Sequence, residues 1–124
     1  MLLGGVHEAL QTSLGDMRAG WTRRAATGNI AIVAIDPRSL DKISVWPWPR
    51  DLHAEIIRKL EQAGAQDIVF DVDFSAASTA TADDKFVAAL RANGGSVVLP
   101  AFKQRSADGT LHITRPLERF SQSA

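Results

Sequence analysis

The chain has 124 residues, of which 45% are hydrophobic and 23% charged, as expected for one globular domain or part of one. Lys plus Arg and Asp plus Glu both number 14, so the net charge is zero and a nucleic-acid partner, which needs a basic surplus or stripe, is not expected. The absence of cysteine excludes disulfides, thiolate nucleophiles and zinc–cysteine sites.

The first predicted element is a helix over residues 5–25. Apolar residues recur there every three or four positions, at Leu3, Val6, Leu10, Leu14, Met17 and Trp21. We favour a helix packed on the domain core; a stalk that continues an upstream membrane helix or pairs with a second subunit is the alternative. The chain is accordingly divided into an N-terminal helix, residues 1–27, and an α/β domain, residues 28–124.

Residues 30–35 are continuously apolar and rich in β-branched side chains, which predicts a strand covered on both faces. The run is far too short to span a bilayer. Asp36 and Pro37 end it, so Asp36 is expected at the carboxyl end of a strand, and residues 39–43 are expected to form a single turn.

The block Trp46-Pro47-Trp48-Pro49-Arg50 predicts a stiff extended loop, because each proline fixes its own φ and disfavours α geometry in the residue before it. Pro49 suits the first turn of a helix that runs to residue 63 and stops at Gly64. The predicted buried stripe of this helix is Leu52, Ile56, Leu60 and Ala63, and Ile57 is expected to widen it. Its predicted outward residues include Arg50, and His53 is expected on the solvated side.

A second strand is predicted over residues 67–72, and Asp71 and Asp73 near its end are expected to point to the same face. Thr81 and Asp84 resemble a capping box for a helix over residues 82–93. A third strand is expected over residues 96–101. Turn residues 106–109 predict a hairpin between residues 102–105 and 110–114, and Pro116 opens another helix.

This order predicts an α/β fold: a small parallel sheet built from βαβ crossover units in a three-layer, Rossmann-like arrangement. An N-terminal amphipathic helix and a C-terminal β-hairpin are added to it. A sheet of three strands would leave an exposed edge, so we expect the chain to be part of a larger domain.

Asp36, Asp71 and Asp73 are expected together, because the carboxyl ends of neighbouring parallel strands meet at one edge of a sheet. Such a cluster could bind a divalent cation or the Arg50 guanidinium. We favour a structural role for each, in which Asp36 caps a turn and Asp71 pairs with Arg50. Trp46 and Trp48 could stack on a ligand, although filling a gap over the sheet edge is the favoured role.

The string Asp71-Val72-Asp73-Phe74-Ser75 resembles the nucleophile motif of haloacid-dehalogenase-like phosphatases. That family has threonine or valine where Ser75 stands and carries the motif on its first strand. A metal-dependent phosphatase using Asp71 and Asp73 is therefore only an alternative. No phosphate-binding glycine loop and no nucleophile elbow is present.

The chain resembles the N-terminal portion of the second type of CHASE domain, the sensory extracellular domains associated with cyclases and histidine kinases. The likeness is carried by residues 14–18, by the run from Ile30 to Leu40, by the Trp46–Arg50 block, and by Gly64-Ala65, residues 70–74, Asp84 and residues 97–100. The Trp-Pro block after an Ile-Asp-x-x-Ser-Leu run is its most specific part.

The resemblance implies a non-catalytic sensory domain on the periplasmic face of the bacterial cytoplasmic membrane, within an integral membrane protein. It implies a cytoplasmic output that is a nucleotide cyclase, a cyclic-di-GMP cyclase or phosphodiesterase, or a histidine kinase. The ligand would be an unknown small molecule or protein, and no cofactor or metal is expected. Candidate ligand-binding or signalling residues are Asp36, Ser39, Trp46, Trp48, Arg50, Asp71, Asp73 and Asp84. A structural dimerisation module, with the N-terminal helix as the interface, is a further alternative.

Overall fold

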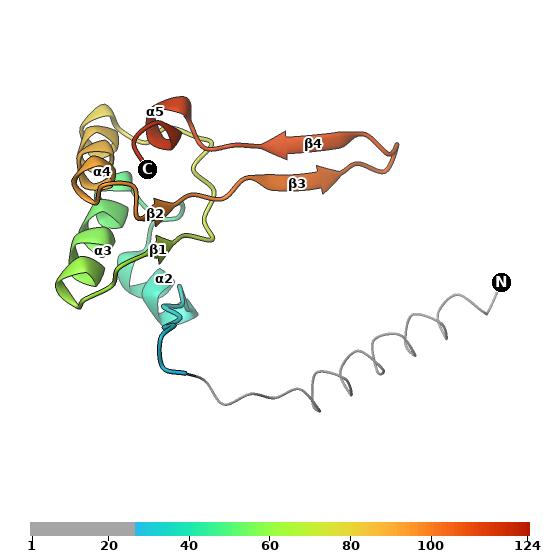
Figure 1. Ribbon diagram of the computed structural model, residues 1–124. Helices are drawn as coiled ribbons and strands as arrows, with labels where there is room; N and C mark the ends of the chain where they lie inside the picture. Colours follow the sequence, from blue (N-terminus) through green and yellow to red (C-terminus); the bar gives the residue numbers. More distant parts are fainter. Residues whose placement is uncertain (1–26) are drawn as a thin grey trace. The chain divides into compact units, whose positions relative to one another are not determined.

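The computed structural model describes residues 27–124, which form a small α/β structure (Figure 1). Its elements in chain order are α2 (Pro37–Ile43), α3 (Arg50–Gln62), β1 (Ile68–Val69), α4 (Ala80–Ala92), β2 (Val97–Val98), β3 (Phe102–Arg105), β4 (Leu111–Thr114) and α5 (Glu118–Ser121). The chain divides into two units, residues 1–35 and 36–124, and all of these elements belong to the second unit. The predicted helix over residues 5–25 lies outside the described residues.

The predicted strand over residues 30–35 is wrong, because these residues adopt no regular secondary structure. Ile30 and Ile32 are largely exposed. A strand needs a neighbour to accept and donate its backbone hydrogen bonds, and no ladder includes this segment. An apolar, β-branched run therefore gives strand propensity without the partner that makes a strand.

Helix α3 begins and ends as the sequence predicts, but it buries a different face. Pro49 is its N-cap, and Gly64, at φ +93°, follows its C-cap in the left-handed region that favours glycine. The buried residues are Arg50, His53 and Ile57, spaced three and four apart. Of the predicted core residues, Ile57 is fully buried, Leu52, Ile56 and Leu60 are half-buried at the sides of that face, and Ala63 is exposed.

Strands β1 and β2 pair in parallel and are joined by α4, which confirms one βαβ crossover unit. The Ile68 amide donates to the Ser96 carbonyl and the Phe70 amide to the Val98 carbonyl. Helix α4 starts two residues earlier than predicted, because Thr79 and not Thr81 is its N-cap. The Thr79 hydroxyl accepts the Ala82 amide at 3.3 Å.

The core lies between the β1–β2 pair and the helices. Its buried members are Ile57, Ile68, Phe70, Phe74, Phe86, Leu90, Val97 and Phe120, drawn from α3, α4, α5, both parallel strands and the loop after β1. Helices α3 and α4 pack side by side, and α5 packs on α4 (Figure 1). On the other face of the pair, Val69 and Val98 are exposed. The described residues thus cover one face of a two-stranded sheet, and the predicted three-layer arrangement stays a prediction.

The predicted hairpin is confirmed. Strand β3 pairs antiparallel with β4, and the turn is closed by the Ser106 amide donating to the Thr110 carbonyl at 2.9 Å. The hairpin extends away from the helices of its unit (Figure 1). The helix predicted after Pro116 is the short α5.

Candidate functional site

The Trp-Pro block places one tryptophan in the core and the other in solvent. The Trp46–Pro47 peptide bond is cis. Trp48 is 5% exposed and Trp46 is 58% exposed, and their rings meet edge-on with centroids 5.9 Å apart. Trp48 is therefore buried, as the predicted gap-filling role requires, whereas Trp46 presents its ring to solvent.

Arg50, the first residue of α3, is buried beneath the loop that follows β1. It is 3% exposed, and Nη2 donates to the Asp73 carbonyl at 3.3 Å and to the Ala76 carbonyl at 2.9 Å. Its guanidinium carbon lies 4.9 Å from the centroid of the Phe74 ring, a cation–π contact. The predicted outward position of Arg50 is wrong, and within the described residues its hydrogen bonds go to backbone carbonyls, not to the Asp71 carboxylate.

The charge of Arg50 is buried but compensated. Desolvation lowers the pKa of its guanidinium, while the carboxylates of Asp83 and Asp73 raise it. Arginine starts from so high a pKa that it remains protonated. A permanent cation therefore fixes the carbonyls of the β1–α4 loop.

Other groups hold the same loop. The buried Asp83 carboxylate accepts the Ser78 amide at 3.1 Å, and the Leu117 amide donates to the Phe74 carbonyl at 2.9 Å. The Asp73 carboxylate accepts the Ser75 amide at 2.7 Å, which lowers the pKa of Asp73. Residues from α3, α4 and the start of α5 thus converge on one loop, residues 73–79, which we call the clamped loop.

Asp83 is a functional candidate that the sequence did not single out, because the predicted role went to its neighbour Asp84. Asp83 is 2% exposed, and Arg119 Nη1 lies 3.8 Å from it. Asp84 is exposed and bonds to Arg119 Nη2 at the surface. The signal available in the sequence was position: an acidic side chain in the first turn of α4 can turn back toward the loop before it.

His53 lies one turn after Arg50 and is 1% exposed, so its predicted solvated position is wrong. Its ring contacts Trp48, Phe70, Phe74 and Phe86, with centroid distances from 5.2 to 6.2 Å. Nδ1 lies 3.2 Å from the Pro49 carbonyl. Because a carbonyl can only accept, Nδ1 carries the hydrogen, and Nε2 keeps a lone pair with no hydrogen-bond partner in the described structure.

Asp36 is the N-cap of α2, as predicted. Its carboxylate accepts the Ser39 amide at 2.8 Å and the Ser39 hydroxyl at 2.6 Å, and these bonds lower the pKa of Asp36. Asp71 is exposed beyond the end of β1. The expected acidic cluster of Asp36, Asp71 and Asp73 does not form: residues 27–124 contain no group of three acidic or histidine side chains arranged to hold a metal ion.

The predicted site residues therefore separate into two groups. Trp48 and Arg50 are buried, and Arg50 bonds to the clamped loop. The others lie at or near the surface: Asp36, Ser39, Trp46, Asp71, Asp73 and Asp84. The structure brings Arg50 to the Asp73 backbone and Trp46 to Trp48, but it does not assemble the whole set into one pocket.

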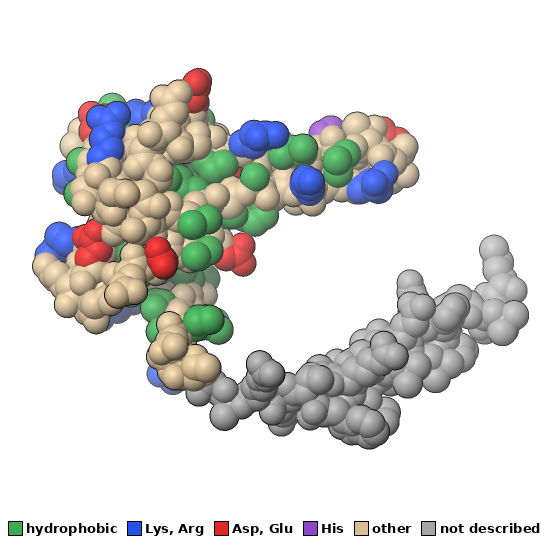
Figure 2. All heavy atoms as spheres, in the orientation of Figure 1, with side chains coloured by type: hydrophobic (Ala, Val, Ile, Leu, Met, Phe, Trp, Pro, Cys, Tyr) green, Lys and Arg blue, Asp and Glu red, His purple; other side chains and the backbone are tan. Residues whose placement is uncertain are grey.

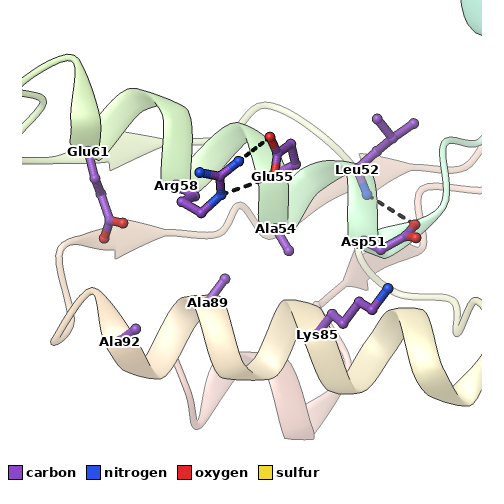
Figure 3. Close-up of a pocket in the computed structure, with 9 residues that line it drawn as sticks. All are labelled: Asp51, Leu52, Ala54, Glu55, Arg58, Glu61, Lys85, Ala89 and Ala92. Atoms are coloured by element: carbon purple, nitrogen blue, oxygen red, sulfur yellow. Dashed lines mark hydrogen bonds and ion pairs between the residues drawn. The ribbon is translucent and has the colours of Figure 1, made fainter.

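A groove of about 550 Å³ lies elsewhere, between α3 and α4 (Figure 3). Its floor includes the small side chains Ala54, Ala89 and Ala92, and its rim carries charges of both signs. On that rim Arg58 bonds to Glu55, and Lys85 extends from α4 toward the start of α3 (Figure 3). None of the candidate ligand-binding or signalling residues predicted from the sequence lines this groove.

These features define a small α/β domain in which the buried side chains of Arg50, His53 and Asp83 bond to backbone groups. The model of the CHASE2 domain family matches residues 1–119, and the chain belongs to that family. No curated protein and no solved structure matches the chain. CHASE2 domains are sensor domains of signalling proteins, not catalytic ones, and are typically extracytoplasmic. None of the helices within residues 27–124 has the length and apolar character needed to cross a membrane.

Proposed function

We propose that this chain is the extracytoplasmic, ligand- or signal-sensing part of a bacterial transmembrane signal-transduction protein. The observation that carries the proposal is the CHASE2 match over residues 1–119. The output of the whole protein is a nucleotide cyclase, a cyclic-di-GMP cyclase or phosphodiesterase, or a histidine kinase in the cytoplasm. A phosphatase-like enzyme using Asp71 and Asp73 is the alternative; in this structure the Asp73 carboxylate accepts the Ser75 amide.

The responsive region that we propose is the clamped loop together with the exposed Trp46. The exposed groups that a ligand could contact are the Asp73 carboxylate in the loop, the Asp71 carboxylate two residues before it, and the Trp46 ring. A ligand that moves the loop must move the carbonyls of Asp73 and Ala76, and these are bonded to Arg50 at the start of α3. Loop displacement is thereby coupled to α3, a helix shift of the kind that transmits signals between packed elements. Asp36, Ser39 and Asp84 are further candidates on the surface.

The segment that would pass the signal toward the membrane is the predicted helix over residues 5–25. Its apolar stripe suits either a homodimer interface or continuation of a membrane helix. Rotation or sliding of this helix would convert a change in the domain into a change in the output module.

The proposal is tested in the whole membrane protein by measuring its output activity with and without an inducing periplasmic extract. We expect Trp46→Ala and Asp73→Asn to change the response while the basal output and the protein level stay the same, because both side chains are exposed. Asn keeps an oxygen that can accept the Ser75 amide, so Asp73→Asn removes charge without breaking the loop. Arg58→Ala, on the solvent side of α3, is the matched control. A response unchanged in both site variants and in Asp71→Asn would contradict the site.

A separate experiment tests the compartment. An alkaline phosphatase reporter fused after residue 124 is active only when exported, and a green fluorescent protein at the same position fluoresces only when it stays in the cytoplasm. In each fusion the reporter replaces whatever follows residue 124 in the full-length protein. We expect alkaline phosphatase activity from the first fusion and no fluorescence from the second. The opposite pattern would overturn the extracytoplasmic placement independently of the site.

A further inference from the structure

One face of the β3–β4 hairpin combines aliphatic and basic side chains. Lys103 is paired with Ile113, and Arg105 is paired with Leu111. Because directly opposite residues of an antiparallel pair share a face, and side chains alternate along each strand, these four lie together. The other face carries Phe102, Gln104, His112 and Thr114. We call the first set the basic–aliphatic face.

The basic–aliphatic face is open to solvent. Leu111 is 50% exposed and Ile113 is 42% exposed, and both of the paired cations are exposed. Arg115 adds a third cation one residue past β4. Figure 2 shows Lys and Arg side chains alternating with hydrophobic ones along the hairpin. Within residues 27–124 none of these three cations forms a salt bridge.

The local charge is unusual for this chain, which is neutral as a whole. Between residues 102 and 115 there are three Lys or Arg and one acidic residue, Asp108. The Asp108 carboxylate lies in the turn, where it accepts the Thr110 amide at 2.9 Å. Arg105 also donates to the Gly109 carbonyl at 3.0 Å, which holds the guanidinium over the turn. The acidic group is thus confined to the tip, and the face behind it is positive.

We propose that the basic–aliphatic face docks on the surface of an anionic phospholipid membrane. Aliphatic side chains enter the headgroup boundary, while Lys and Arg stems lie along it and their charged ends reach lipid phosphates. A protein partner fits less well, because protein interfaces are depleted of lysine at their centre, and Lys103 stands there opposite Ile113. Two aliphatic residues also cover much less area than a stable protein interface needs. The inference goes beyond the sensory function and does not depend on it.

The binding predicted is weak and salt-dependent. Each basic residue near an anionic surface contributes a modest, roughly additive attraction, and salt screens it. Such a contact does not anchor a protein alone. It orients the β3–β4 hairpin of a protein that is already close to a membrane.

The test is vesicle cosedimentation of the purified 124-residue chain. One vesicle preparation is pure phosphatidylcholine, and the other contains about one third phosphatidylglycerol, an anionic lipid. We expect binding to the anionic vesicles alone, and its loss when salt is raised from about 0.1 M to about 1 M. Lys103→Gln with Arg105→Gln should weaken the partition coefficient roughly thirtyfold. Leu111→Ser with Ile113→Ser should also weaken it.

Two controls separate the face from general charge and from unfolding. Gln104→Ala with His112→Gln changes the opposite face of the same hairpin and should leave binding unchanged. Lys42→Gln with Lys59→Gln removes two exposed cations from α2 and α3 and should have a much smaller effect. The thermal transition of every variant should match that of the parent chain, since all the changed side chains are exposed.

The proposal is overturned if the parent chain ignores anionic vesicles at low salt, or binds both lipid preparations equally. It is also overturned if Lys103→Gln with Arg105→Gln weakens binding no more than Lys42→Gln with Lys59→Gln does. Self-association that is lost in the Leu111→Ser, Ile113→Ser variant, without vesicle binding by the parent, would identify a second copy of the chain as the occupant instead.

Discussion

Arg50 shows how one buried cation can organise a domain of this size. Its guanidinium satisfies two loop carbonyls and packs on Phe74. Removing it leaves the Asp73 and Ala76 carbonyls without these part-buried hydrogen bonds. Arg50 therefore supports the loop of the proposed site, while the exposed residues at and near that loop are its proposed contact groups.

The first prediction concerns the stability that Arg50 provides. Arg50→Ala should lower the free energy of unfolding by about 2–4 kcal/mol, because it removes charge-assisted hydrogen bonds and leaves a cavity. Arg58→Ala should cost less than about 1 kcal/mol, because its ion pair with Glu55 is exposed. Urea denaturation followed by tryptophan fluorescence measures both. Equal losses in the two variants would show that the Arg50 bonds contribute no more than a surface pair.

The second prediction concerns pH. Burial lowers the pKa of His53 from 6.5, the adjacent Arg50 lowers it further, and the Pro49 carbonyl and Asp51 raise it. The native ring is therefore neutral where the unfolded ring already binds a proton, so the free energy of unfolding falls as pH drops below about 6.5 toward the native pKa. Urea denaturation at a series of pH values from about 7.5 to about 5.5 should show this fall.

The matched control for His53 is the exposed His112 on the hairpin. His53→Gln should flatten the pH dependence in that window, and His112→Gln shows what the same substitution does at an exposed position. A parent chain whose stability is constant across the window would mean that His53 protonates without cost, against its burial among aromatic rings.

The sequence predicted the Trp-Pro block and its helix correctly, but it misplaced the two polar residues that matter most. Arginine and histidine are usually solvated, so Arg50 and His53 were assigned to the outer face and the buried stripe was displaced by one position. A clue was nevertheless present: Arg50, His53 and Ile57 have helical spacing of their own. Which of two adjacent stripes faces inward depends on the Phe74 and Phe86 rings that meet it, and periodicity in one helix does not contain that information.

At the scale of elements, turn and capping residues predicted the secondary structure more reliably than apolar runs did. The hairpin, the glycine stop of α3 and the Asp36 cap depend on neighbouring residues, and all three were predictable. The strand over residues 30–35 was not, because pairing is decided by residues far along the chain. The same reasoning applies to the expected acidic cluster, whose formation required Asp36 to follow a strand beside β1.

The third prediction concerns the cap of α4. Thr79→Ala should lower the free energy of unfolding by about 1 kcal/mol, because the Thr79 hydroxyl accepts the Ala82 amide. Thr81→Ala is the matched control, since Thr81 is exposed within the first turn and alanine is a good helix former. Thermal unfolding of both variants measures the difference. A larger loss for Thr81→Ala would restore the capping box that the sequence suggested.

At the scale of the whole described unit, stability is expected to be uneven. The β1–β2 pair is short, but its inner side chains Ile68 and Val97 are buried against the helices. The hairpin is longer, yet most of its side chains are exposed, and an isolated two-stranded hairpin is only marginally stable in water. The length of a strand therefore predicts its local stability poorly in this structure, and the burial of its side chains predicts it better.

The fourth prediction follows for backbone hydrogen exchange. The amides of Ile68 and Phe70, which donate to Ser96 and Val98 carbonyls, should exchange only on global unfolding. The Ser106 amide, bonded to the Thr110 carbonyl, should exchange about a hundredfold faster or more, through local opening of the hairpin. Exchange followed residue by residue by NMR measures both. Equal protection of Ser106 and Phe70 would contradict the prediction, because it would mean that the hairpin is covered, and loss of that protection on dilution would show that a second copy of the chain covers it.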